Sequence, residues 1–365
     1  MASELPTPRA PLAPTAPPAP AAGGGRVEEC RRLLARSTAE VFGEPARAVV
    51  LARRALQLAR NLAAEEPGDA ERADLEALAW GLVANAERVA ADLDAAGAAM
   101  RRAEERRAEG SGDPRLAARL LDLRASLAAT GGRLDEGVRL ADEAVAAYLR
   151  LGDAGGLGRA LVQTAVFQAH AEDTGRALDV LAQAFEHLVP REDHHSVLAA
   201  TPCLAFCLHR MGYDIPAAEL VDQAASAVGE SGDRVLLLRL CWLKARIQMS
   251  LGHDGETELR RIRDAFLDRG MVYDAAIACL DLATLYARRG RLPDLRRLAR
   301  EMFPIFTSRG IHREALAALL LLRDTLSSGR AELPFLEEVK SFLERSRHDH
   351  GLRFRSGAAR GRAPF

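Results

Sequence analysis

Residues 112–153 read GDPRLAARLLDLRASLAATGGRLDEGVRLADEAVAAYLRLGD, and the features of this stretch recur along the chain at a fixed distance. Asp113, Asp153, Asp193 and Asp233 stand 40 residues apart, and each closes a short turn-like segment. Leucines follow Asp113 at positions 116, 120, 123 and 127, which is the spacing of one face of an α-helix. A fixed period of this length predicts a repeat protein.

Each repeat also contains a second turn near its middle, so the expected unit is a helix, a tight turn and a second helix. These turns are marked by Gly132, Glu172, Gly212, Gly252, Gly290 and Gly329. The aspartates are positioned to act as N-caps, and glycine after the first helix supplies a left-handed backbone conformation. The chain contains no useful β-branched run with alternating polarity, so the predicted fold class is all-α.

Small residues recur at equivalent places inside the repeats. Successive first helices carry Ala84, Ala125, Ala165, Ala205, Ala245 and Ala283, and the second helices carry the pairs Ala96 and Ala103, Gly137 and Ala144, Ala177 and Ala184, and Ala217 and Ala224. Two helices approach closely only where the side chains at their crossing are small. These positions therefore predict the crossing points of the helix hairpins.

This pattern of three small residues resembles the tetratricopeptide repeat over residues 44–310. The helices are longer than in the consensus of about 34 residues, so the chain is more similar to the variants of about 40 residues found in bacterial regulators and uncharacterised bacterial proteins. The resemblance implies a right-handed α-solenoid of about eight antiparallel hairpins. It weakens late in the chain, where Thr257, Asp264, Leu295 and Met302 replace small residues, and irregular packing is expected beyond residue 252.

The predicted organisation has three parts. Residues 1–25 form a leader rich in proline and alanine, residues 26–347 form the solenoid, and residues 348–365 form a basic tail. The leader and the tail are both expected to be disordered. Pro202 and Pro304 fall where the periodicity predicts the interior of a helix, so each is expected to kink or shorten its helix.

Composition limits the class of protein. The chain of 365 residues has 50 Lys and Arg against 51 Asp and Glu, and its formal net charge is −1. Such a balance gives no general attraction to nucleic acid or to a membrane surface. No apolar run is long enough to cross a bilayer. The chain has five cysteines, an odd number, and they are not spaced in pairs. This predicts free thiols and a location in the reducing cytoplasm.

None of the usual sequence signatures of a catalytic or phosphate-binding site is present, so neither an enzyme nor a cofactor is predicted. Cys203, Cys207 and His209 are the best metal candidates, because two thiols four residues apart share one helical face. Small buried cysteines commonly replace alanine where helices cross, and this explanation is favoured here. The adjacent His194 and His195 diverge on a helix and are interpreted as a surface turn.

In the tetratricopeptide repeat the first helices line a concave groove, and the resemblance carries this role to ten positions. The predicted groove residues are Asn85, Arg88, Arg119, Asp122, Ser126, Arg159, His209, Arg239, Trp242 and Arg246. A row of guanidinium groups can clamp carboxylates, and tryptophan can supply an apolar anchor. The alternative is that these arginines pair with acidic residues of adjacent repeats, such as Asp122.

The sequence thus predicts a non-enzymatic scaffold or adaptor that binds an acidic segment of a partner protein in its groove. The competing hypothesis is the signal- or peptide-sensing half of a bacterial regulatory system, whose solenoid changes pitch on binding. A weaker alternative is nucleic-acid binding through the arginine-rich segment 288–300. That segment has no interleaved aromatic residues on which bases could stack.

Overall fold

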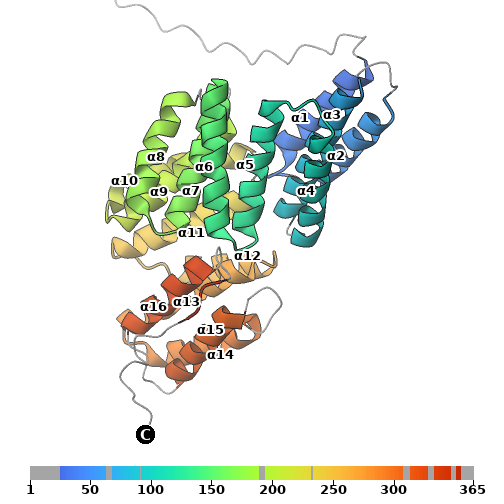
Figure 1. Cartoon of the computed structure of the whole chain (residues 1–365). Coiled ribbons are helices and arrows are strands. Elements are labelled where there is room, and N and C mark those ends of the chain that lie inside the picture. Colours follow the sequence, from blue (N-terminus) through green and yellow to red (C-terminus); the bar gives the residue numbers. More distant parts are fainter. Residues whose placement is uncertain are drawn as a thin grey trace, which may run out of the picture.

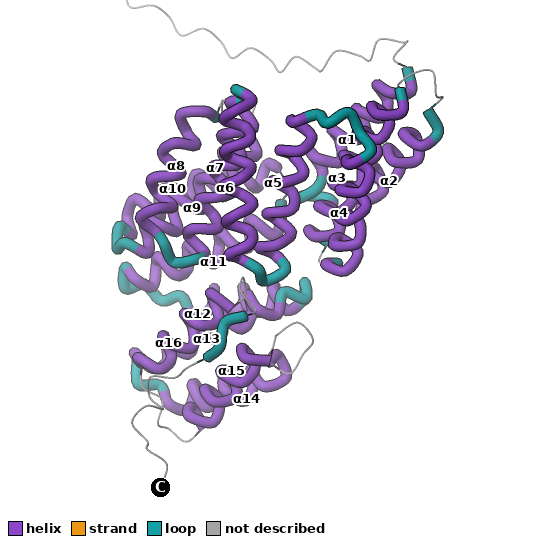
Figure 2. Tube along the Cα trace, viewed as in Figure 1, coloured by secondary structure: helices purple, strands orange, loops and turns teal. Residues whose placement is uncertain are grey.

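The computed structural model describes residues 25–62, 68–90, 92–188, 194–231, 233–306, 313–327, 333–346 and 351–354. Within these ranges the chain forms sixteen α-helices and no strand (Figures 1 and 2). The helices are α1 (Arg26–Glu40), α2 (Pro45–Arg60), α3 (Asp69–Val89), α4 (Leu93–Ala108), α5 (Pro114–Thr130), α6 (Leu134–Leu151), α7 (Ala154–His170), α8 (Thr174–His187), α9 (His194–Arg210), α10 (Asp214–Ser231), α11 (Arg234–Ser250), α12 (Glu256–Leu267), α13 (Val272–Arg288), α14 (Leu292–Phe306), α15 (Arg313–Ser327) and α16 (Leu333–Ser346). The all-α solenoid predicted from the repeat period is confirmed.

The helices form two layers. Consecutive helices pack as hairpins, with α3 on α4, α5 on α6, α7 on α8 and α9 on α10. The odd-numbered helices also contact one another along the array, α3 with α5, α5 with α7, α7 with α9 and α9 with α11. Helices in the inner layer of a curved array lie closer together than those outside it. The first helices α3, α5, α7, α9 and α11 therefore form the concave layer.

The predicted turn chemistry is present. The carboxylates of Asp113, Asp153 and Asp233 accept hydrogen bonds from backbone N–H groups in the first turns of α5, α7 and α11, at 2.9, 2.8 and 2.9 Å. Asp193 lies outside the described residues, as does Gly329. The other mid-repeat turn residues all have positive φ: Gly132 (75°), Glu172 (64°), Gly212 (83°), Gly252 (89°) and Gly290 (65°).

Replacing Asp153 with alanine is expected to lower the free energy of unfolding by about 1 kcal/mol, because it removes the acceptor for the Gly156 N–H. Urea unfolding followed by circular dichroism measures the change. Asp153→Asn keeps a side-chain acceptor and serves as the control. Equal losses in the two variants would show that the carboxylate acts through something other than the cap.

The predicted crossing positions are buried throughout. Ala84, Ala125, Ala165, Ala205, Ala245 and Ala283 are each no more than 1% exposed. The small residues of the second helices are buried as well, namely Ala96, Ala103, Gly137, Ala144, Ala177, Ala184, Ala217 and Ala224. Gly137 packs so closely on α5 that a Cβ there would lie 3.2 Å from the Ala125 carbonyl oxygen. The small residues therefore set the distance between the two helices of each hairpin.

The array becomes irregular after α11, as expected. The short helix α12 packs mainly on α13, and α13 also contacts α14 and α16. Leu295 and Met302 bury large side chains where earlier repeats carry alanine, so α14 cannot approach its neighbour as closely. In Figure 1 these last helices lie below the layers formed by α5 to α11. Pro202 lies inside α9 and Pro304 within the bounds of α14, and the predicted kinks stay predictions.

Part of the predicted tail packs on the core of the protein. Apart from Gly25, the leader predicted over residues 1–25 lies outside the described residues. Of the tail predicted as disordered from residue 348, the structure describes residues 351–354. There the Phe354 ring packs on Phe342 with centroids 5.0 Å apart, and Leu352 also joins the core. This part of the tail packs on the fold because it supplies two apolar side chains.

None of the helices in the described ranges combines the length and the hydropathy that a membrane span requires.

Candidate partner-binding surface

The ten predicted groove residues fall into two groups. Asn85 and Arg88 lie on α3, Arg119, Asp122 and Ser126 on α5, and Arg159 on α7. These six lie on neighbouring helices of the concave layer, and we call them the α3–α7 surface. His209 lies on α9, and Arg239, Trp242 and Arg246 lie on α11, where further helices pack against them.

Arg88 is the most unusual group of the α3–α7 surface. Its guanidinium donates to Asn85 Oδ1 at 2.8 Å and to Thr130 Oγ1 at 3.2 Å, and both acceptors are neutral. Burial lowers the pKa of Arg88 to about 10, although the nearby Asp122 carboxylate acts in the opposite direction. Arg88 therefore remains charged at neutral pH, and none of the described carboxylates lies within ion-pair distance of it.

Asp122 on α5 forms contacts within its own helix and with α7. It is only 6% exposed, and Arg119 lies 2.6 Å from its Oδ2 atom. Gln163 on α7 donates to the Asp122 carbonyl oxygen at 3.1 Å and to Ser126 Oγ at 2.6 Å, which ties α5 to α7. Gln163 was not among the predicted residues, because only the packing of two helices reveals its role.

Tyr148 lies close to the same charges. Burial, together with the Asp122 carboxylate, raises the pKa of Tyr148 to about 12, whereas Arg119 and Arg159 favour the ionised form. Charged groups of both α5 and α7 therefore act on the Tyr148 hydroxyl. The Arg159 side chain is exposed, and Arg119 is half-buried. With Arg88, this surface presents three guanidinium groups and one buried carboxylate.

The α11 group is engaged inside the molecule. Trp242 was predicted to be an apolar anchor for a partner, but it is 8% exposed, and its Nε1–H donates to Asp281 Oδ2 on α13 at 2.8 Å. Its ring packs against the edge of Phe266, with centroids 5.4 Å apart. Arg239 Nε lies 3.6 Å from Asp274 Oδ1, also on α13. For these residues the structure favours the alternative of pairing within the chain.

Helix α16 completes this intramolecular network. Arg246 lies 3.0 Å from Glu344 Oε1 and 3.9 Å from Asp281 Oδ1, and Lys340 forms an ion pair with the same Asp281 oxygen. The His209 ring forms a hydrogen bond of 2.6 Å with the Asp214 side chain. Burial lowers the pKa of His209, and the charges of Arg246 and Lys340 lower it further. His209, Trp242 and Arg246 therefore have partners within the chain, and their predicted binding roles stay predictions.

Glu172 extends the contacts of α16 to the turn between α7 and α8. Its carboxylate accepts a hydrogen bond from Ser341 Oγ at 3.1 Å and lies 3.7 Å from Arg345 and 3.5 Å from Arg210. Glu172 is the non-glycine residue with positive φ in the described chain. Its side chain thus holds α16 beside the concave layer although its backbone conformation is unfavourable.

The arginine-rich segment 288–300 is largely neutralised by the protein itself. Arg288 pairs with Glu337 at 3.2 Å, Arg289 with Asp254 at 3.2 Å, and Arg291 with Asp294 at 2.7 Å. Arg297 lies 2.5 Å from Asp294, whereas Arg296 and Arg300 are exposed. This pairing reduces the positive charge that a phosphate backbone would meet and does not favour nucleic-acid binding.

Cys203, Cys207 and His209 do not come together as a metal site. Cys203 and Cys207 are buried in the apolar core between α7, α8 and α9, and His209 bonds to Asp214. All five cysteines are free thiols. Among the described residues, no group of three or more metal-ligating side chains could hold an ion. The side chains of His194 and His195 lie outside the described residues.

The solved structures with a similar fold include the following two. One is a Rap protein complexed with Competence and Sporulation Factor, which has a TM-score of 0.64 and 13% identity and covers 88% of each chain. The other is Aspartyl phosphate phosphatase F from Bacillus subtilis, which has a TM-score of 0.52 and 14% identity and covers 79% of this chain and 73% of that one. No protein-family model matches the sequence. No curated protein is significantly similar to it in sequence. At these identities the likeness establishes the shared helical-repeat fold.

Proposed function

We propose that this chain is a non-enzymatic scaffold of tetratricopeptide-like repeats, which binds an acidic segment of a partner protein at the α3–α7 surface. The observation that carries the proposal is the environment of Arg88. The Arg88 guanidinium is partly desolvated and hydrogen-bonds to neutral oxygens. Pairing with a carboxylate ligand therefore stabilises it more than it would stabilise a fully solvated guanidinium. Arg119 and Arg159 extend the positive charge along the same layer.

The binding surface proposed here is smaller than the set of ten residues predicted from sequence. Trp242 and Arg246 are engaged by α13 and α16, and His209 is engaged by Asp214 of α10, so a partner would contact α3, α5 and α7. Such a surface fits a short extended or helical segment, because each of the three first helices contributes one arginine to it. The cytoplasmic location expected from the free cysteines is part of the same proposal.

A second candidate function is the peptide- or signal-sensing half of a bacterial regulatory system. It is supported by the likeness to the Rap protein that was solved in complex with Competence and Sporulation Factor. The two functions share one surface and differ in the ligand, which is a partner protein in the first and a free peptide in the second.

The test is a selection from a library of random 12-residue peptides on the immobilised full-length chain. The selected peptides are expected to be enriched in Asp and Glu, and their affinity should fall as salt rises, because exposed charge pairs are screened. Fluorescence polarisation with one selected peptide then compares the parent with Arg119→Gln/Arg159→Gln. We expect the double variant to bind about tenfold more weakly or worse.

The matched control is Arg101→Gln/Arg150→Gln, which removes the same charge from exposed positions on α4 and α6. Thermal melts of all three proteins show whether each variant is folded. The proposal fails if the selection returns peptides without acidic residues, or if the control variant loses as much affinity as the α3–α7 variant.

A further inference from the structure

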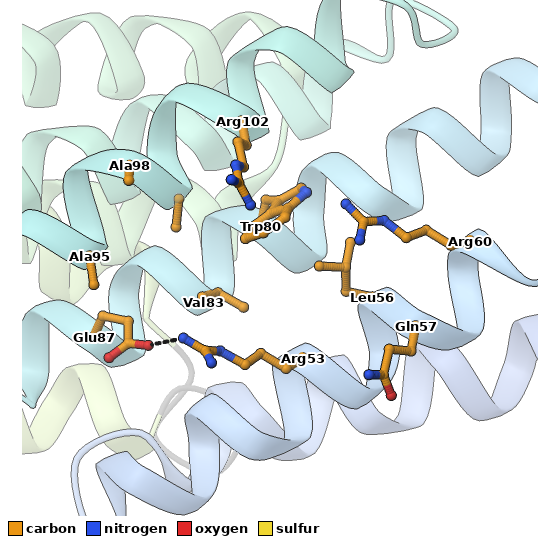
Figure 3. Close-up of a pocket in the computed structure, with 11 residues that line it drawn as sticks. Arg53, Leu56, Gln57, Arg60, Trp80, Val83, Glu87, Ala95, Ala98 and Arg102 are labelled. Carbon is orange, nitrogen blue, oxygen red and sulfur yellow. Dashed lines mark hydrogen bonds and ion pairs between the residues drawn. The ribbon is translucent and has the colours of Figure 1, made fainter.

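A cavity of about 380 Å³ lies between α2, α3 and α4, outside the surface discussed above. It is lined by the half-buried Trp80 ring of α3 and by the apolar side chains of Leu56, Val83 and Ala99. Figure 3 shows three arginines around it, Arg53 and Arg60 from α2 and Arg102 from α4. Because α2 and α4 are second helices, this Trp80 pocket belongs to the outer layer.

The charges around the Trp80 pocket are unbalanced. Arg53 is neutralised by Glu87, whose Oε1 atom lies 2.7 Å away. Arg60 lies 3.7 Å from Glu76, but Glu76 is shared with Arg106 at 3.1 Å. The described residues place no carboxylate within ion-pair distance of Arg102. The pocket therefore carries a surplus of positive charge at Arg60 and Arg102.

Both of these guanidinium groups are directed at the tryptophan ring. The Arg102 Cζ atom lies 4.8 Å from the Trp80 ring centroid, and the Arg60 Cζ atom lies 5.4 Å from it (Figure 3). The ring stabilises the cations through its quadrupole but cannot neutralise them. The positive charge of both guanidinium groups therefore remains available to an anionic ligand in the pocket.

The rest of the pocket sets the size and polarity of its ligand. Alanines at positions 95, 98 and 99 of α4 keep the space open, and Leu56 and Val83 supply apolar surface. A cavity of this volume lies at the small end of the range of ligand pockets. It suits one compact apolar group with one charged end and is too small for a helix.

We propose that the Trp80 pocket binds a compact monocarboxylate, with its apolar body against Trp80 and its carboxylate between Arg60 and Arg102. The carboxylate can belong to a free aromatic or aliphatic acid or to the C-terminal residue of a peptide, since both present the same chemistry. The pocket is separate from the α3–α7 surface, so the two proposals can fail independently.

Isothermal titration calorimetry on the full-length chain tests the proposal with two pairs of probes. 3-Phenylpropionate and its amide represent the free acid, and N-acetyl-Gly-Gly-Phe with a free or an amidated C-terminus represents the peptide. We expect at least one acid to bind and its amide to bind about tenfold more weakly, because only the carboxylate pairs with the guanidinium groups. Binding of the tripeptide alone would identify a peptide C-terminus as the ligand.

Arg102→Gln is expected to weaken acid binding about tenfold, and it breaks no ion pair of the parent protein. Arg101→Gln, at the exposed neighbouring position of α4, is the matched control and should bind normally. Arg119→Gln/Arg159→Gln should also bind normally, because those arginines belong to the other layer. The proposal is overturned if neither acid binds at about 10 mM, if acid and amide bind equally, or if Arg102→Gln has no effect.

Discussion

Replacing Asp281 with alanine is expected to lower the free energy of unfolding of the C-terminal helices by about 3 to 5 kcal/mol. The Asp281 carboxylate is 2% exposed and holds three groups at once, namely the Trp242 Nε1–H, Lys340 and Arg246. Alanine would leave the indole N–H and the Lys340 ammonium without this acceptor, whereas Arg246 would keep its ion pair with Glu344. An uncompensated buried charge is among the largest effects of a single substitution.

Asp281→Asn separates the hydrogen bond from the charge. The amide oxygen can still accept a hydrogen bond from Trp242, so the free energy of unfolding should fall less than with alanine. Some loss should remain, because the neutral amide does not balance the charges of Lys340 and Arg246. Urea unfolding followed by Trp242 fluorescence in a Trp80→Phe background reports on this region alone. Asp324→Asn is the control, since Asp324 is exposed and pairs with Arg323 on the surface, and it should shift the midpoint little.

The dependence on pH gives a second readout of the same prediction. Burial alone would raise the pKa of Asp281, but Lys340 and Arg246 hold it below its ordinary value. A carboxyl with a lowered pKa in the folded state contributes its stabilisation above its ordinary pKa of about 4, and this is lost as pH falls towards the folded value. The difference in the free energy of unfolding between the parent and Asp281→Asn should therefore be constant near neutral pH and shrink below about pH 4. Equal midpoints for Asp281→Ala and the parent at neutral pH would contradict the prediction.

The features that were predictable from the sequence are those that depend on neighbours along the chain. Asp153 caps α7 through a residue three positions away, and Gly132 takes its left-handed conformation because no side chain opposes it. Ala125 is buried where α5 crosses the helix that follows it directly. Local hydrogen bonding and helical periodicity decide such features, so the repeat boundaries and the crossing points follow from residue spacing.

The position of α16 could not be predicted in this way. Ser341 and Glu172 are 169 residues apart and share no repeat position. Trp242 has the spacing of a groove residue in its own helix, yet α13 buries it because Asp281 offers an acceptor for its N–H. The contacts that α13 and α16 make with the predicted groove residues of α11 depend on this return of the chain. The Trp80 pocket could not be predicted for a different reason, because it depends on how side chains of three packed helices leave a space between them.

Replacing Gly137 with leucine is expected to lower the free energy of unfolding by about 3 kcal/mol, because the new side chain would be forced into α5. Even a Cβ at this position would lie 3.0 Å from Ala129 Cβ and 3.2 Å from both the Ala125 carbonyl oxygen and the Ala129 nitrogen. Two of these three atoms belong to the backbone, so α5 and α6 would have to separate. Urea unfolding followed by circular dichroism measures the loss.

Gly97 provides a control of opposite sign in the preceding second helix. A Cβ there would meet only the end of the Arg101 side chain, at 3.7 Å, which is an ordinary contact. Gly97→Ala should therefore stabilise the protein by about 0.5 to 1 kcal/mol, since alanine restricts the unfolded chain and suits a helix interior. If Gly137→Leu were tolerated as well as Gly97→Ala, the small residues would not set the hairpin distance. Opposite signs at two glycines in successive second helices would show that burial against the first helix, and not helix propensity, keeps residue 137 small.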